Sequence, residues 1–175
     1  MQRRQVIKSV ALGFGSLLTL PAWANNWNKE RIFSNEFLSG NQENILTEIV
    51  ETIIPETTTP GAKSLGVDKL IQKLVTDCYG KEAEIKLADG LNKIDALAMK
   101  NVGKSFMDLN RTERLDLLTS INASDNAELK EILKNLKSMT VNGYTKSEYF
   151  MTNMTDYEFA PARFYGCVPA KINKE

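Results

Sequence analysis

Apolar residues recur along this chain at steps of three and four positions, which is the spacing of amphipathic helices. The first such stripe comprises Ile45, Leu46, Ile49, Val50, Ile53 and Ile54. Asn41 is expected to cap this helix, and Pro55 to end it, because proline cannot continue the backbone hydrogen-bond ladder. Further helices are expected to begin near Val67, Glu82, Asn110, Asp125 and Thr145.

No stretch alternates between apolar and polar residues for long enough to predict a strand. The pattern therefore predicts an all-α fold, a single small helical domain of about five to six helices around one core. This domain is expected to span residues 41–175, preceded by an irregular arm over residues 25–40.

Several polar residues and glycines mark where these helices are expected to begin or end. Asn110, Asp125 and Thr145 each precede a glutamate by three positions, which is the spacing of a capping box. Gly143 is expected to end the helix that begins near Asp125. The helix that begins near Asn110 is expected to carry its apolar stripe on Leu115, Leu117, Leu118 and Ile121.

The chain has two cysteines, Cys78 and Cys167. Cys78 continues the apolar stripe that begins at Val67, so it is expected to point inward from the last turn of the second helix. An even number of cysteines in an exported protein predicts a disulfide, here Cys78–Cys167, which contributes about 4 kcal/mol through loop closure. Two buried free thiols, or a bridge to another subunit, are the alternatives.

Residues 1–24 have the features of a twin-arginine export signal. Arg3 and Arg4 are followed by Lys8, then by a weakly apolar stretch that is too short to span a membrane. Cleavage is expected after Ala24, at a small-x-small pattern. The protein is therefore expected in the periplasm; an ordinary secretory signal and an uncleaved membrane anchor are the alternatives. Twin-arginine export carries folded proteins, often with a cofactor already bound.

The composition excludes several classes of active site. The chain contains no histidine, which removes the commonest general base and the commonest metal ligand. It also lacks a Walker loop, and the expected mature chain has no Gly-x-Gly-x-x-Gly motif. No catalytic or metal-binding residue is predicted, and acid pairs such as Glu82/Glu84 and Glu113/Asp116 are expected to be solvated. The charges are mixed in sign, so nucleic acid is not an expected partner.

The C-terminal segment differs from the helical stretches before it. Residues 157–169 are rich in aromatic residues, proline and glycine, which predicts an irregular aromatic tail. The tail either covers the core or binds a partner, since tyrosine, phenylalanine and arginine are enriched at interface hot spots.

Several motifs resemble the gluconate 2-dehydrogenase subunit 3 family. They are Glu48-Ile-Val-Glu-Thr-Ile-Ile-Pro55, Thr58-Thr-Pro-Gly-Ala62, Asp77-Cys-Tyr79, Gly103-Lys-Ser-Phe106, Gly143-Tyr-Thr-Lys-Ser-Glu148 and Ala162-Arg-Phe-Tyr-Gly-Cys-Val-Pro169. The resemblance implies a helical subunit that binds no cofactor itself. Its implied partner is a large FAD-containing dehydrogenase of the glucose-methanol-choline type, which oxidises a sugar, sugar acid or alcohol. In complete complexes, a multihaem cytochrome c is the third subunit.

The expected function is that of a non-catalytic small subunit, which escorts the folded flavoprotein through the twin-arginine translocase and then stabilises it. Five aromatic and basic residues are expected to contact the partner: Tyr144, Phe159, Arg163, Phe164 and Tyr165. The alternative is a stand-alone periplasmic binding or scaffold protein without a dehydrogenase.

Overall fold

The computed structural model describes residues 37–155, 157–158 and 160. Its α-helices are α3 (Gly40–Ile53), α4 (Val67–Leu74), α5 (Lys81–Val102), α6 (Arg111–Ala123), α7 (Ala127–Thr145) and α8 (Glu148–Met154). A π-helix, η2 (Val75–Tyr79), follows α4 directly, and a 3₁₀ turn, η3 (Phe106–Asp108), precedes α6. No strand occurs in the described part of the chain, so the prediction of a small all-α domain is confirmed.

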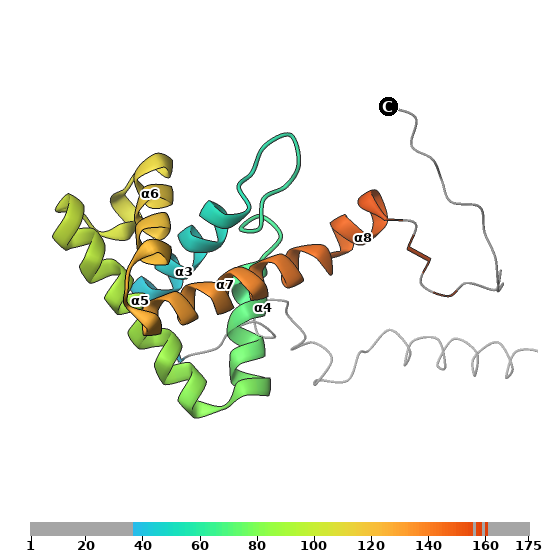
Figure 1. Cartoon of the computed structure of the whole chain (residues 1–175). Helices are drawn as coiled ribbons and strands as arrows, with labels where there is room; N and C mark the ends of the chain where they lie inside the picture. Colours follow the sequence, from blue (N-terminus) through green and yellow to red (C-terminus); the bar gives the residue numbers. More distant parts are fainter. Residues whose placement is uncertain (1–36, 156, 159, 161–175) are drawn as a thin grey trace, which may run out of the picture.

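Helix α3 lies in the middle of the domain and packs against α4, α5, α6 and α7 (Figure 1). Its apolar stripe is buried at four positions, Ile45, Leu46, Ile49 and Val50. The long helices α5 and α7 pack against each other, and both pack against α3. α8 lies beyond the end of α7, away from α5 and α6 (Figure 1).

The residues that cap the helices agree with the sequence prediction at one position and differ at three. Asn110 and Glu113 form the expected capping box at the start of α6. α3 is capped by Ser39 instead of Asn41, because Ser39 and Gln42 form a capping box that begins two positions earlier. The predicted caps Asp125 and Thr145 are also wrong: Asn126 caps α7 and Ser147 caps α8.

Gly143 does not end α7, which continues to Thr145. A Cβ at this position would lie 2.9 Å from Val67 Cγ1 and 3.2 Å from Leu70 Cδ2. Gly143 therefore lets α7 and α4 approach closely. The prediction that it ends α7 was wrong, because the sequence does not distinguish a glycine at a helix crossing from one at a helix end.

Leu115 is also placed differently from the prediction. Its side chain is 54% exposed, whereas Leu117, Leu118 and Ile121 are buried as expected. A helix turns by roughly 100° per residue, so Leu115 lies roughly 200° away from Leu117 around α6. Leu115 thus belongs to the outer surface of the domain.

Cys78 is exposed, which contradicts the prediction that it points inward. It lies in the π-helix η2, where each turn holds more residues than an α-turn. The wider turn moves the residues after Val75 away from the buried face of α4, so Asp77, Cys78 and Tyr79 all lie on the surface. Among the described residues, no helix combines the length and the apolar character that a membrane span requires.

Candidate partner-binding surface

The connection between α3 and α4 contains residues 55–61, which we call the Thr-Pro loop. Both of its ends are fastened to the domain. The Glu56 amide donates to Glu51 Oε1 over 2.8 Å, and the Tyr144 hydroxyl donates to the Pro60 carbonyl over 3.1 Å. Between these anchors, Glu56 and the two threonines that follow it are exposed. Hydrogen bonds at both ends therefore hold this solvent-facing loop in a defined conformation.

Gly61 allows the Thr-Pro loop to close tightly over Glu51. A Cβ on Gly61 would lie 2.5 Å from the Glu56 amide nitrogen and 2.9 Å from Glu51 Oε2. Glu51 Oε2 is buried and has no hydrogen-bond partner among the described residues. The carboxylate thus lies beneath the loop, and only glycine fits above it.

Glu48 joins three separate parts of the chain through its carboxylate. Lys63, just after the Thr-Pro loop, donates to Glu48 Oε1 over 2.8 Å. Arg114 of α6 donates to Glu48 Oε2 through Nη1. The same guanidinium donates to the carbonyls of Phe106 and Met107, over 3.2 and 2.6 Å. The cluster therefore connects α3 to the turn that precedes α4, to η3 and to α6.

The charges in this cluster shift two pKa values. Burial alone would raise the pKa of Glu48, but the Lys63 hydrogen bond and the charges of Arg114 and Lys63 outweigh it and lower that pKa. The hydrogen bond to Glu48 raises the pKa of Lys63. Both groups therefore remain charged at neutral pH.

Asp95 positions the Gly103-Lys-Ser-Phe106 motif at the end of α5. Its Oδ1 accepts hydrogen bonds from the Ser105 hydroxyl at 2.7 Å and from the Phe106 amide at 2.8 Å. The Phe106 side chain is fully buried in the core, and the Arg114 guanidinium lies 5.8 Å from the centre of its ring. The motif therefore contributes to the core through the buried side chain of Phe106.

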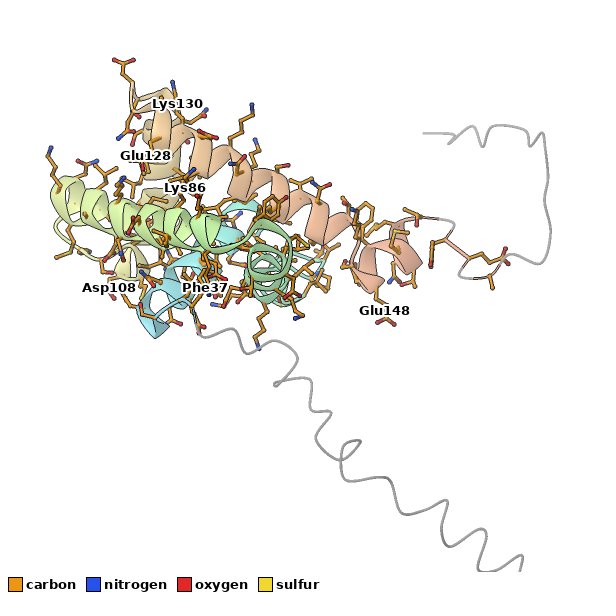
Figure 2. The ribbon with its side chains drawn as sticks, turned by 90° about the horizontal axis from the view of Figure 1, so that it is seen from below. Phe37, Lys86, Asp108, Glu128, Lys130 and Glu148 are labelled. Carbon is orange, nitrogen blue, oxygen red and sulfur yellow. The ribbon has the colours of Figure 1, made fainter. Side chains whose placement is uncertain are left out.

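Tyr144 connects the Thr-Pro loop to α8. Its ring packs edge-to-face on Phe150, with 5.8 Å between the ring centres. Its hydroxyl is occupied by Pro60, so the structure assigns Tyr144 an internal role, and its contact with a partner stays a prediction. Glu128 and Lys130 lie at one end of α7. Figure 2 shows that Glu148, and with it α8, lies beyond the opposite end. The Thr-Pro loop and α8 are thus held by one side chain.

The other predicted site residues lie outside the described residues: Arg3, Arg4, Lys8, Ala24, Phe159, Arg163, Phe164, Tyr165 and Cys167. The export signal, the cleavage site, the Cys78–Cys167 bridge and four of the five partner contacts therefore stay predictions.

Glu84 differs from its expected solvated state. It is only 6% exposed and accepts from Lys81 Nζ over 2.9 Å. It precedes the buried Leu87 by three positions, so it lies on the inner face of α5. Within the described ranges, no group of three or more acidic or cysteine side chains is arranged to hold a metal ion.

Arg114 was not singled out from the sequence, although it makes the most contacts in the Glu48 cluster. A signal was present: it lies three and four positions before Leu117 and Leu118, which puts its stem beside the apolar face of α6. Its acidic partner, 66 positions away, cannot be identified from such spacing.

One of three comparisons with known proteins gives a match. The family model described as gluconate 2-dehydrogenase subunit 3 matches residues 40–162, from the start of α3 to the first residues of the aromatic tail. Neither the curated proteins nor the solved structures include a match.

Proposed function

The chain belongs to the gluconate 2-dehydrogenase subunit 3 family, whose members are accessory subunits of dehydrogenase complexes. We propose that it is the non-catalytic small subunit of an FAD-dependent dehydrogenase. The observation that carries this proposal is the family match, which covers all six described α-helices. The partner would be a large flavoprotein of the glucose-methanol-choline type, and it would hold the FAD. A multihaem cytochrome c would accept its electrons in the complete complex.

The second part of the proposal is that this subunit escorts the flavoprotein out of the cytoplasm. A flavoprotein folds around its cofactor, so it would cross the membrane already folded. The Arg3-Arg4 signal on this chain would direct both proteins to the twin-arginine translocase. In the periplasm, or at its membrane face, the subunit would remain bound and stabilise the folded partner by mass action.

The proposed docking surface comprises the Thr-Pro loop, α8 and the aromatic tail. The loop is ordered before any partner binds, which lowers the entropy cost of association. Met154 and Tyr157, at the end of α8 and just beyond it, are exposed apolar side chains. They lead directly into the tail that carries Phe159, Arg163, Phe164 and Tyr165.

A pull-down of the tagged chain from periplasmic and membrane fractions tests the proposal. The expected result is a co-purifying large subunit with a flavin absorbance spectrum, in a fixed ratio to this chain. A colourless preparation without a stoichiometric partner would contradict it and favour a stand-alone scaffold protein. Alanine at both Phe164 and Tyr165 should weaken capture if the tail is part of the interface; full retention by a folded variant would remove the tail from it.

A further inference from the structure

A groove of about 390 Å³ opens on the surface where α3, α6 and α7 meet. Its apolar lining comes from Ile53 at the end of α3, Leu115 and Leu118 of α6, and Leu133 of α7. Of these, Leu118 is buried, whereas Leu115 is 54% exposed. Leu115 therefore exposes a large apolar surface to water within the groove.

The charged residues that line this groove are both lysines. Lys134 and Lys137 are exposed, and they lie three positions apart on the same side of α7. Neither forms an ion pair with any residue in the described part of the chain. Elsewhere on α7, by contrast, Glu128 is paired with Lys93 of α5 over 2.6 Å. The rim of the groove therefore carries two positive charges that form no close ion pair within the described residues.

We propose that this groove binds an apolar side chain flanked by carboxylates on the flavoprotein partner. An apolar anchor in a pocket, surrounded by a polar rim, is the usual arrangement of an interface hot spot. The two lysines would attract acidic neighbours of the anchor and would set its orientation. The inference rests on the proposed function, because it assigns a binding site to that partner.

The position of the groove agrees with this occupant. Ile53 belongs to the segment Glu48–Pro55, one of the motifs that resemble the family, and this segment continues directly into the Thr-Pro loop. A partner that contacts the loop therefore meets the groove next to it. A small polar ligand fits less well, since no buried, unpartnered polar atom belongs to a lining residue.

Two variants and two matched controls test the inference. Leu115→Asp removes the apolar contact, and the double change Lys134→Glu/Lys137→Glu reverses the rim charge. Met99→Asp is the control for the first, because Met99 is equally exposed, at 54%, and does not line the groove. Lys86→Glu/Lys100→Glu on α5 controls for the change in net charge. All of these side chains are exposed, so the variants are expected to fold, which circular dichroism checks.

The readout is the affinity of each purified variant for the flavoprotein that the wild-type chain captures. Leu115→Asp and the lysine reversal are expected to weaken binding about ten-fold each, with the controls unchanged. The effect of the lysine reversal should shrink as salt is added. Unchanged affinity of both groove variants would overturn the inference while leaving the proposed function in place.

Two other outcomes are also decisive. If the wild-type chain captures no flavoprotein, the proposed function fails, and this inference fails with it. If Leu115→Asp instead changes the oligomeric state of the isolated chain without affecting flavoprotein binding, the groove binds a second copy and the inference is wrong.

Discussion

The Tyr144 hydroxyl donates a hydrogen bond to the carbonyl of Pro60, 84 positions earlier in the chain. This bond connects the last turn of α7 to the Thr-Pro loop, while the Tyr144 ring packs on Phe150 of α8. One side chain therefore holds two parts of the proposed docking surface in a fixed relationship.

Replacing Tyr144 with phenylalanine tests this connection, because it removes the hydroxyl and keeps the ring. The free energy of unfolding is expected to fall by about 1 kcal/mol, the net value of one such hydrogen bond. Amide exchange should become faster in the Thr-Pro loop and stay unchanged in α5. Equal exchange rates in the loop of both proteins would show that the bond does not order it.

The Glu48 cluster predicts a cost for losing one charge. Glu48→Gln leaves the Arg114 guanidinium, whose side chain is only 15% exposed, without its carboxylate. The free energy of unfolding is expected to drop by about 2 kcal/mol near neutral pH, as measured in urea. Glu131→Gln, an exposed position on α7 that forms no ion pair with a described residue, is the matched control and should change little.

The same cluster predicts how this difference depends on pH. The pKa of Glu48 is lowered in the folded state, so its contribution is fully present above its ordinary value of 4.5 and is lost as the pH falls through the folded value. The pKa of Lys63 is raised, so its contribution is lost only as the pH rises above 10.5. The difference in free energy of unfolding between the wild type and Glu48→Gln should therefore disappear at acidic pH. A difference that persists there would rule out the carboxylate charge as its cause.

Two glycine-to-alanine changes separate steric fit from backbone propensity. Gly61→Ala places a Cβ against the Glu56 backbone and is expected to destabilise the protein by about 1–3 kcal/mol. Gly40→Ala, at the start of α3, has nothing within 4 Å and should stabilise it by about 0.5 kcal/mol through helix propensity. Thermal unfolding of both variants measures these changes in stability. Equal changes in the two variants would argue against a tightly closed loop.

The cysteines give a further prediction. Because Cys78 is exposed, its thiol is accessible for pairing after export. The exported protein is expected to show no free thiol in denaturant without reductant, as the Cys78–Cys167 bridge requires. Two reactive thiols would contradict the bridge, and release of a second protein on reduction would identify an intersubunit bond instead.

The parts of this fold that depend on local spacing could be predicted from the sequence. The stripe from Ile45 to Val50 is buried, and Asn110 and Glu113 cap α6, because both follow from helical periodicity and neighbouring backbone groups. Cys78 was misplaced because a π-turn changes the helical period without a recognisable sequence signal. The Glu48–Arg114 pair could not be predicted, because it depends on how two distant helices cross.

If this subunit carries its flavoprotein partner across the membrane, the distribution of flavin between cell fractions depends on the Arg3-Arg4 signal. In cells with the double change Arg3→Lys/Arg4→Lys, the flavin-loaded large subunit is expected to stay in the cytoplasm together with this chain. In wild-type cells, the large subunit and this chain should both reach the periplasm. A large subunit that reaches the periplasm while this chain is retained would show that the flavoprotein is exported without this subunit.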